Sequence, residues 1–545
     1  MRFLDLNDLD DDSVLESSLC VVGTGPAGAS IALEFEGTGI DVLVLESGGY
    51  DDDADTQRCY EIETVGETPR RIDQDELRRR VLGGSSRIWT GRCAPFSELD
   101  LAERSWIPYS GWPLTLKELE PYLQRAAIRL GLAPNSYDES LWKGFGVKRP
   151  SPSLDAHLLE PMFWQFSKSP DHSGKAANFA SYLLRSNASN LRVLLHANVT
   201  HINTNAEGTS FASVEVRSLQ KKHALVRARA VVVACGGVEN ARLLLASSRL
   251  MPNGVGNDHD IVGRFLMDHT TCVLGNFPPQ EADPIRERFG HYWLDNSGGR
   301  NVYLQGLALS GEIQQREHLL NCHAYVEEYD PAVDDPWSAL RQLKSAISAR
   351  LAIGRAFGDA RTVLAHFGEV GLGFYRRLVK HRPELVRVNR LELHCMMEQV
   401  PDPESRITLS ADTTDPLGMA LSKIRWKMSE LERHTARRMS QLVSDELRRL
   451  GLPAPLLTQF LDEDDWMAHF VERAHPAGST RMSIDAKQGV VDRNSQVHGV
   501  RGLFVSGSSV FPTSGAANPT LMIVAMALRL ADRLKQTHFN SGTNS

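Results

Sequence analysis

The sequence lacks any run of 18 apolar residues, and its first residues, "MRFLDLNDLDDDSV", lack the basic and apolar regions of a secretory signal. The sequence also lacks paired cysteines: its seven cysteines are scattered, are odd in number and form no C-x-x-C pair. Neither a disulfide framework nor a thiolate metal site is therefore predicted. We expect a soluble protein of the reducing cytoplasm, with no transmembrane segment and no metal.

An excess of basic residues is also missing. The formal net charge is -8, and acidic residues gather early in the chain, in "DLNDLDDDS" and "GGYDDDADT". This distribution argues against a nucleic-acid partner. No internal repeat is visible, and the composition is that of a globular protein, with 42% hydrophobic and 23% charged residues. A chain of 545 residues predicts two or more domains that can bury a large cofactor.

The stretch "LCVVGTGPAGASI" near the N-terminus predicts a strand, a glycine-rich turn and a helix, and "DVLVLES" predicts a second strand soon after. In such a unit Gly23 forms the tight turn, Gly25 lets a pyrophosphate approach, and Gly28 lets the helix pack on the strand. Glu46 ends the second strand, where a carboxylate can accept hydrogen bonds from ribose. The motif predicts a dinucleotide site but leaves open whether NAD or FAD binds.

The middle of the chain adds further elements. Residues 191–204 and 213–247 predict strands, a Gly-Gly turn and a helix that return to the nucleotide fold, and residues 110–132 predict a capped helix. Alternating strands after residue 275 predict a separate sheet. Residues 336–382 predict two amphipathic, locally basic helices, which we interpret as a solvated cap in preference to a membrane or partner surface.

Near the C-terminus, "GLFVSGSS" predicts a short strand and "NPTLMIVAMALRLADRL" a long helix. Asn518 is expected at the N-cap of this helix and Pro519 at its first helical position. The partial positive charge of such a helix start would stabilise negative charge on a reduced flavin. The small residues of "SGAA" would let the backbone approach a flat ring.

Six stretches follow one another along nearly the whole chain: "VVGTGPAGASIALEF…VLVLESG", "RRVLGGSSRIWTGRCAPF", "VVVACGGVENARLLLAS", "VGRFLMDH", "HPAGSTRMS" and "VHGVRGLFVSGSSVFPTSGAANPTLMIVAMALRLAD". In this order they resemble motifs of the glucose-methanol-choline (GMC) oxidoreductases, a family of FAD-dependent enzymes. The ending is most similar to that of bacterial members that oxidise sugars and glycosides. The resemblance implies an α/β (α+β overall) fold, with a discontinuous Rossmann-like FAD-binding domain and a second substrate domain built on an antiparallel sheet with helices.

The resemblance also implies boundaries and a site. The FAD-binding domain is expected at residues 1–100, 185–275 and 470–545, and the substrate domain at 101–184 and 276–469 with the helical insert. His475 matches the family's active-site base and Asn518 its second polar residue. The cofactor-binding residues expected from the motifs are Gly23, Gly25, Pro26, Ala27, Gly28, Glu46, Ser47, Arg80, Gly83, Gly84, Ser85, Ser86, Trp89, Val199, Ala234, Gly236, Gly507, Ser508, Asn518, Pro519 and Thr520.

The chemistry implied is the oxidation of an alcohol to a carbonyl. A neutral imidazole at His475 would accept the hydroxyl proton while flavin N5 accepts the hydride, and Asn518 would hold the substrate oxygen. Some members tether FAD to a histidine in the segment matched here by "GGSSRIWTG", which contains none, so noncovalent FAD is expected. The substrate is expected to be a sugar, glycoside, polyol or glycosylated metabolite, and the electron acceptor O2 or an unidentified carrier.

Alternatives remain. A flavin-scaffolded lyase of the cyanohydrin type, or a binding protein without turnover, could carry the same motifs, and the oligomeric state is open. His269, His469 and His498 are interpreted as structural, whereas Glu398 and Gln399 are either substrate-domain site residues or polar groups on a sheet surface. Substrate specificity is expected to reside in residues 275–470.

Overall fold

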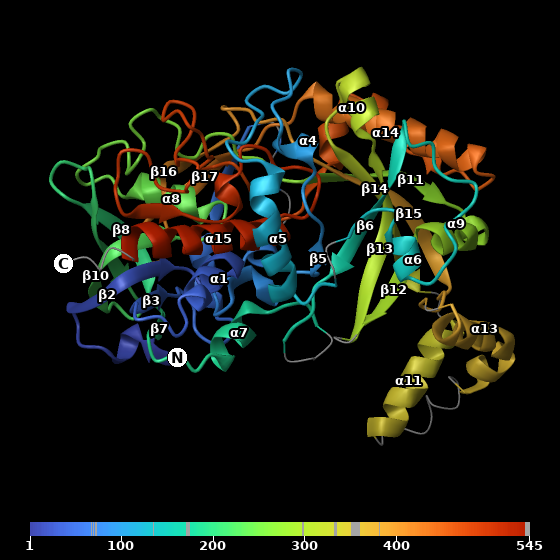
Figure 1. The fold of residues 1–545 in the computed structure, drawn as a ribbon, viewed down its shortest axis with the longest axis horizontal. Helices are drawn as coiled ribbons and strands as arrows, with labels where there is room; N and C mark the ends of the chain where they lie inside the picture. The colour runs from blue at the N-terminus through green and yellow to red at the C-terminus, as the bar shows by residue number, and fades with distance from the viewer. Residues whose placement is uncertain are drawn as a thin grey trace.

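Three β-sheets form the framework of the protein. The structure is a computed structural model that describes residues 1–66, 68, 70, 74–133, 136–170, 175–296, 299–331, 335–349, 360–380 and 382–539. Within these residues the strands form sheets of eight, nine and three strands, here called the first, second and third sheets. Figure 1 shows the first sheet in one lobe of the molecule and the second sheet in the other.

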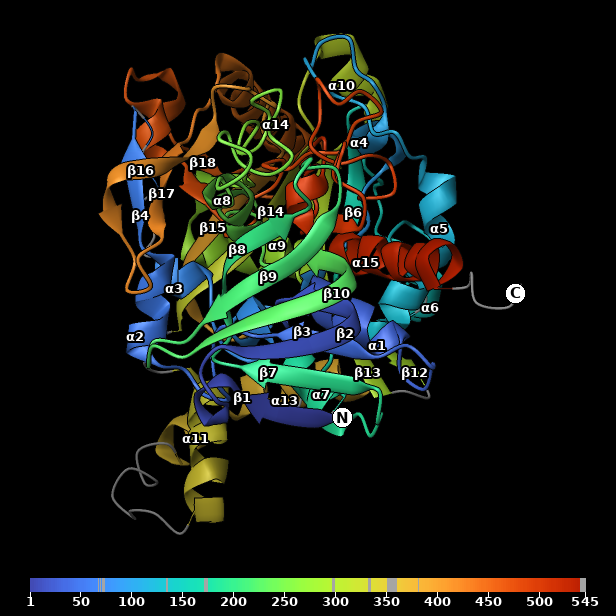
Figure 2. The ribbon, with the colours of Figure 1, turned by 90° about the vertical axis from the view of Figure 1, so that its left-hand side faces the viewer.

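The first sheet has the strand order β1-β7-β3-β2-β10-β9-β8, with β20 paired to β10. The pairs from β1 through to β10 are parallel, as is β10 with β20, whereas β9 runs antiparallel to both β10 and β8. Figure 2 shows these strands stacked one above another. Their bounds are β1 Arg2–Asp5, β2 Ser13–Val22, β3 Val42–Leu45, β7 Leu191–Leu195, β8 Asn198–Thr204, β9 Phe211–Arg217, β10 His223–Val233 and β20 Leu503–Val505.

The central strands of this sheet are apolar without alternation because both of their faces are covered. Every residue of β3 is buried, and so are the last four residues of β2 and of β10. Continuous burial of this kind is typical of parallel strands covered by helices. The sequence interpretation of a strand, turn, helix and strand at the N-terminus is confirmed by β2, α1 (Pro26–Glu34) and β3.

The second sheet has the order β18-β11-β15-β14-β13-β6-β5, with β12 paired to β13 and β19 to β11, and all of its pairs are antiparallel. Its strands are β5 Arg92–Cys93, β6 Leu159–Phe166, β11 Thr270–Phe277, β12 His291–Asn296, β13 Gly299–Leu309, β14 Cys322–Pro331, β15 Val388–Met397, β18 Leu456–Leu457 and β19 Val471–Glu472. The third sheet contains β4 Ile62–Val65, β16 Arg406–Thr414 and β17 Ala420–Arg425.

The helices surround these sheets. Besides α1 they are α2 Ala54–Gln57, α3 Gln74–Leu77, α4 Glu98–Leu101, α5 Leu116–Arg129, α6 Leu141–Gly144, α7 Phe179–Arg185, α8 Glu239–Ala246, α9 Ala282–Phe289, α10 Gly311–Glu317, α11 Pro336–Ala349, α13 Phe367–Leu378, α14 Glu430–Arg449 and α15 Thr520–Leu534. The predicted capped helix is α5, where Thr115 and Glu118 form a capping box. No helix among the described residues combines the length and the hydrophobicity needed to cross a bilayer.

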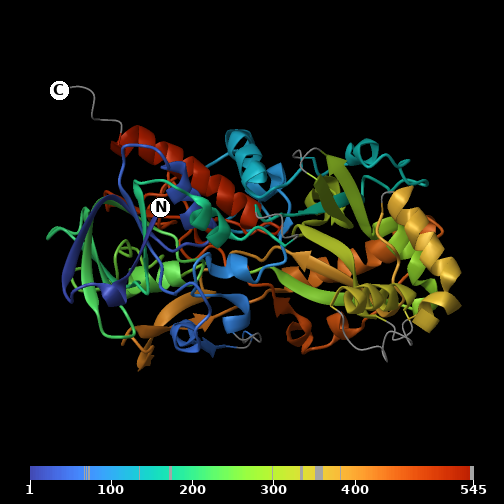
Figure 3. The ribbon, with the colours of Figure 1, turned by 90° about the horizontal axis from the view of Figure 1, so that it is seen from below.

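The C-terminal helix α15 packs against α1 and α5. Figure 3 shows α15 running from the C-terminal end of the chain toward the junction between the two lobes, so that its N-terminus lies at that junction. The mixed parallel and antiparallel architecture confirms the predicted fold class. Residues 350–359 and 381 of the predicted helical insert, and residues 540–545 of the predicted FAD-binding domain, lie outside the described residues.

Candidate active site

Four parallel strands of the first sheet end at the same level. Val22 pairs with Leu45 and with Val233, and Val233 pairs with Val505. The chain then turns away from the sheet at Gly23, Glu46, Ala234 and Ser506, all of which line one cavity. Ligands of open α/β sheets bind in the crevice at the carboxyl ends of the strands, so this edge is where a dinucleotide is expected.

The turn after β2 is built for a close approach to this cavity. Gly23 has a φ of +102°, and a Cβ atom there would lie 2.6 Å from the carbonyl oxygen of Ala234. A Cβ at Gly28 would lie 1.9 Å from the carbonyl oxygen of Gly23, so this glycine allows α1 to pack on the turn. A Cβ at Gly25 would meet no protein atom within 4 Å, so the cavity reaches the backbone at the start of α1.

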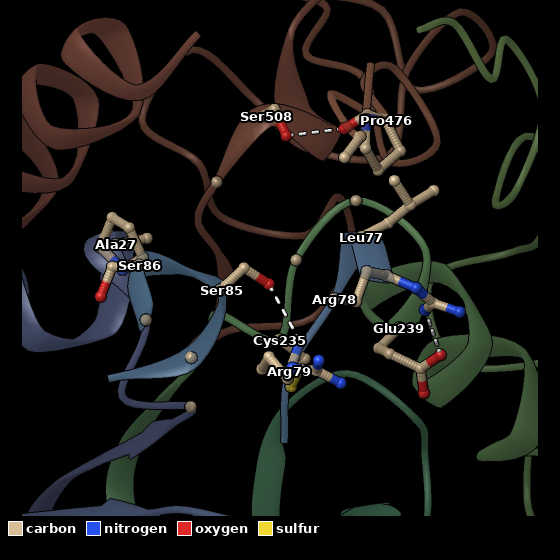
Figure 4. A pocket seen from close by; sticks show the side chains of 18 of the residues that line it. Ala27, Leu77, Arg78, Arg79, Ser85, Ser86, Cys235, Glu239, Pro476 and Ser508 are labelled. Carbon is tan, nitrogen blue, oxygen red and sulfur yellow. Dashed lines mark hydrogen bonds and ion pairs between the residues drawn. The ribbon is translucent and has the colours of Figure 1, made fainter. Parts of the chain in front are cut away.

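The cavity has a volume of about 560 Å³ and extends from these strand ends to the second sheet. Figure 4 shows side chains from several distant parts of the chain around it, among them Ala27, Ser85, Cys235 and Ser508. The predicted site residues that line it are His475, Asn518, Gly23, Gly25, Pro26, Ala27, Glu46, Ser47, Arg80, Gly84, Ser85, Ser86, Trp89, Val199, Ala234, Gly236, Gly507, Ser508, Pro519 and Thr520.

Gly28 and Gly83 are not among the lining residues. Gly83 instead fixes the segment that follows it: its N–H donates to Thr24 Oγ1 at 2.9 Å, and its carbonyl oxygen accepts from Ser86 Oγ at 2.6 Å. A Cβ at Gly84 would lie 3.1 Å from Gly25 Cα. The segment is thereby held against the dinucleotide turn, where only glycines allow the two backbones to come this close.

Glu46 is buried beside the same turn. Its Oε2 accepts hydrogen bonds from the N–H and the hydroxyl of Thr24, and its Oε1 accepts from the N–H of Gly48 at 2.9 Å and from Ser47 Oγ at 3.3 Å. Burial raises the pKa of this carboxyl, while these hydrogen bonds oppose the shift. The carboxylate lines the cavity, so a ribose hydroxyl would have to share it with these protein donors.

A cluster of arginines surrounds one carboxylate at the cavity wall. Glu239, on α8, accepts from Arg78 at 3.0 Å, from Arg80 at 2.8 Å and from Arg242 at 3.2 Å. Burial alone would raise the pKa of Glu239, but the three guanidinium groups lower it to about 2. The sequence interpretation named only Arg80, because the convergence of the other residues depends on contacts between distant segments.

Two histidines meet at the far end of the cavity. His475 Nδ1 lies 2.8 Å from His269 Nδ1, and His269 Nε2 lies 2.8 Å from the carbonyl oxygen of Gly515 and 3.1 Å from that of Ser514. Burial lowers the pKa of His269. For His475, burial and the charges of His269 and Arg473 lower the pKa well below the ordinary value. Both imidazoles are therefore neutral at neutral pH.

These contacts assign the tautomers. Carbonyl oxygens only accept, so His269 Nε2 carries its proton and His269 Nδ1 is an acceptor. His475 Nδ1 must then be the donor between the two rings. His475 Nε2 is left without a proton, which is the form that a general base requires. His269 was interpreted as structural from the sequence; its contact with His475 is a finding of the fold.

Asn518 lies beside this unprotonated nitrogen. Its Nδ2 is 3.5 Å from His475 Nε2, and its Oδ1 is buried without a hydrogen-bond partner. The expectation that Asn518 caps the last helix is wrong by one residue: Pro519 occupies the cap, with φ −77° and ψ −12°, and α15 begins at Thr520. The amide of Asn518 contacts His475, and α15 has no side-chain cap hydrogen bond.

One buried carboxylate holds this corner of the site together. Asp268 Oδ1 accepts from the N–H of His475 at 2.9 Å and from that of His269 at 2.8 Å, while Oδ2 pairs with Arg70 at 2.8 Å. Ala474, directly before His475, has a φ of +60°, a conformation that costs a non-glycine residue free energy. The backbone before His475 is therefore held in one unusual conformation by its surroundings.

Beyond His475 the cavity is lined by charged groups that the sequence analysis did not name. Arg92 lies over the ring of Tyr325, 5.0 Å from its centre, and its guanidinium is 3.7 Å from Glu327 Oε1. Arg473 donates to Thr271 Oγ1 at 2.9 Å and lies 3.5 Å from the hydroxyl of Tyr325. Glu327 Oε2 is buried without a hydrogen-bond partner. Tyr325 and Glu327 are two residues apart on β14, so the alternation of side chains along a strand could have placed them on one face.

Other residues singled out from the sequence lie elsewhere. Glu398 and Gln399 are both 1% exposed, so they are not polar groups on a sheet surface, and they do not line the cavity. Glu398 pairs with Arg104, and Gln399 Oε1 accepts from Trp426. His469 stacks on Phe460, and His498 Nε2 contacts the carbonyl oxygen of Ser483, which agrees with structural roles.

The chain matches two sequence models described as GMC oxidoreductase, one over residues 168–271 and one over residues 401–527. It is 22% identical to 2-methyl-1,2-propanediol dehydrogenase of Mycolicibacterium austroafricanum, over 96% of this chain and 95% of the relative. It is 24% identical to the fructose dehydrogenase large subunit of Gluconobacter japonicus, over 58% of this chain and 48% of that relative. The structure of pyridoxine 4-oxidase from Mesorbium loti is similar with a TM-score of 0.57, at 17% identity over 96% of this chain and all of the other.

Proposed function

Because the chain belongs to the GMC oxidoreductase family, and is therefore an FAD-dependent oxidoreductase that acts on alcohols, we propose that it oxidises one hydroxyl-bearing carbon of a sugar-type substrate. Sugars, glycosides, polyols and glycosylated metabolites belong to this class. The observation that carries the proposal is the neutral His475 whose Nε2 has no proton and lies beside Asn518 at one end of the cavity. A name given to one relative, fructose dehydrogenase large subunit, supports the sugar class.

The residues around the cavity fit FAD. Glycines at its wall leave open space, since a Cβ at Gly25 or at Gly236 would meet no protein atom within 4 Å. The helices α1 and α15 both begin at the cavity, and helix N-termini stabilise negative charge such as that of a pyrophosphate. When bound there, FAD would supply the acceptor for the hydride that leaves the substrate carbon. We expect the cofactor to be held without a covalent bond.

We further propose that residues 1–100, 185–275 and 470–545 form the FAD-binding domain and residues 101–184 and 276–469 the substrate domain. All strands of the first sheet lie in the first set of residues. The second sheet combines strands of the second set with β5, β19 and most of β11 from the first. The cavity is lined from both sheets, which supports a site between a cofactor domain and a substrate domain.

His475 would accept the hydroxyl proton. Its Nε2 is unprotonated because Nδ1 donates to His269, and its lowered pKa keeps the base form available at neutral pH. Asn518 would donate from Nδ2 to the same substrate oxygen, and its unpartnered Oδ1 leaves an acceptor for a neighbouring hydroxyl. The two side chains would fix the oxygen so that the carbon it carries is oriented for hydride loss.

The charged wall next to His475 supports a polyhydroxylated substrate. Arg92 and Arg473 offer several donors around Tyr325, and Glu327 offers a carboxylate whose Oε2 lies 3.9 Å from His394 Nε2. Hydroxyl groups can donate to a carboxylate and accept from a guanidinium, so a sugar satisfies both kinds of partner. A simple aliphatic alcohol would leave these groups unsatisfied, at a cost in affinity.

Anaerobic mixing of the FAD-loaded protein with a panel of sugars, glycosides, sugar acids, polyols and simple alcohols tests the proposal. We expect flavin absorbance to bleach with at least one sugar-type compound, and more strongly than with simple alcohols of the same concentration. Product formation with the flavin still oxidised would instead indicate the lyase alternative. Bleaching by simple alcohols alone would contradict the sugar class.

A further inference from the structure

An apolar surface covers the helical insert that follows β14. The large hydrophobic side chains exposed there lie within 16 residues of sequence and are 47% to 74% exposed. They are Leu364, Phe367, Leu372, Phe374, Tyr375, Leu378 and Val379, here called the insert surface. Contiguous apolar surface of this kind marks a site of interaction with a partner or a membrane.

Most of the insert surface is the outer face of α13, whose inner face is already packed. Val370, Gly373 and Arg376 recur every three residues along α13 and are buried. A Cβ at Gly373 would lie 2.2 Å from the ring of Trp337, so α13 sits directly on α11. Arg376 forms an ion pair with Glu287 of α9. The packed stripe fixes the orientation of α13, and the apolar residues therefore face outward.

The insert also stands away from the rest of the protein. Figures 1 and 2 both show α11 extending from the body of the molecule, and Figure 1 shows α13 beside the second-sheet lobe. In Figure 1 α11 and α13 form the lower right edge of the molecule, with no labelled element beyond them. A flat partner can therefore reach the insert surface without meeting the rest of the described chain.

The charge of the insert is opposite to that of the protein. Residues 336–382 contain nine Lys or Arg and two Asp or Glu, in a chain of net charge -8. Among the described residues, Arg341 and Arg361 are exposed, whereas the exposed Arg377 and Lys380 pair with Glu384 at 3.6 Å and with Glu287 at 3.5 Å. Anionic lipid headgroups attract Lys and Arg that lie near a bilayer surface.

We propose that the insert surface docks on an anionic phospholipid bilayer, with its apolar side chains in the headgroup boundary and the neighbouring Arg341 and Arg361 of the insert at the phosphates. Exposed Phe and Leu side chains beside Lys and Arg are the combination that interfacial helices use. A second copy of the chain is a poorer partner, because a two-fold interface would bring two strongly basic segments together. The inference goes beyond the proposed function and does not depend on it.

Vesicle sedimentation of the full-length, FAD-loaded protein tests the proposal. Vesicles of phosphatidylcholine alone are compared with vesicles that also contain phosphatidylglycerol, at low and at raised salt. The test variant combines Phe367→Ser, Leu372→Ser and Leu378→Ser. The control variant combines Ile128→Ser, Leu184→Ser and Ile484→Ser, which remove equally exposed apolar side chains elsewhere. Equal flavin content and melting temperature establish that all three proteins are folded.

We expect the wild type and the control variant to sediment with the phosphatidylglycerol vesicles, and raised salt to weaken that binding. The test variant should bind these vesicles at least about tenfold more weakly, because its buried apolar area is lost. Equal binding of test and control variants would overturn the proposal. The proposal would also be overturned if the wild type did not bind vesicles of either composition. The same holds if the wild type formed a dimer in place of binding vesicles and the test variant did not.

Discussion

His269 and His475 face each other through their Nδ1 atoms at 2.8 Å, and the carbonyl oxygens at His269 Nε2 decide which ring donates. The proton between the rings belongs to His475, so the opposite nitrogen of His475 is free to accept a proton from substrate. His269 does not line the cavity. It is a positioning residue that acts through His475.

Replacement of His269 tests this relationship. His269→Leu removes the acceptor for His475 Nδ1, and the rate of flavin reduction should fall about 10- to 100-fold. His269→Gln should lose less, because the amide can donate to Gly515 and accept from His475. Stopped-flow reduction of both variants at saturating substrate measures the difference. Equal rates in the Leu and Gln variants would leave His269 with a packing role only.

Asn518→Ala should slow flavin reduction by about 10- to 100-fold, a smaller loss than removal of the base. The reason is that the variant still contains a proton acceptor but no longer fixes the substrate oxygen beside it. Stopped-flow reduction and equilibrium binding of the same sugar measure the two effects. Wild-type values of both would remove Asn518 from the site.

The pH dependence of flavin reduction follows from the lowered pKa of His475. Its base form persists as the pH falls through about 6.5, the ordinary pKa of histidine, so the rate should decline only well below that pH. Arg473→Gln removes a positive charge that lowers this pKa, and the decline should move to higher pH. Arg92→Gln is the matched control, since Arg92 is not among the charges that shift His475. A decline centred near pH 6.5 in the wild type would contradict the geometry.

Acid precipitation should release FAD into the supernatant and leave a colourless pellet. Among the described residues that line the cavity, His475 is the one histidine and Cys235 the one cysteine. Burial raises the pKa of Cys235 to about 12, so its thiol is not a ready nucleophile. The mass of the denatured chain provides the control. A yellow pellet and a chain heavier by the mass of FAD would contradict the expectation.

The sequence predicted best what depends on local patterns. The glycine turn, Glu46 and the final strand and helix lie in short stretches with a clear period, and the structure brings most of the residues predicted there to one cavity. The predicted start of α15 is one residue too early, because a proline is compatible with either the cap or the first helical position. The partners of His475 could not be predicted in the same way. His269 precedes it by 206 residues, and the contact depends on how β19 pairs with β11.

The charged side chains that line the cavity beyond His475 could not be predicted for the same reason, because they also depend on how strands pair. Arg92, Tyr325 and Arg473 come from β5, β14 and the end of β19, and only the strand order of the second sheet brings them together. No spacing in the sequence encodes that order. Substrate specificity was expected in residues 275–470; of the three side chains proposed to meet the substrate, Tyr325 lies in that range, and Arg92 and Arg473 lie outside it.

The central claim is that His475 accepts the substrate proton, and anaerobic stopped-flow reduction of His475→Ala by the best sugar of the panel tests it most directly. The account predicts that the variant folds, binds FAD and reduces its flavin about 100- to 10,000-fold more slowly than the wild type. A variant that bleaches at the wild-type rate would contradict the account.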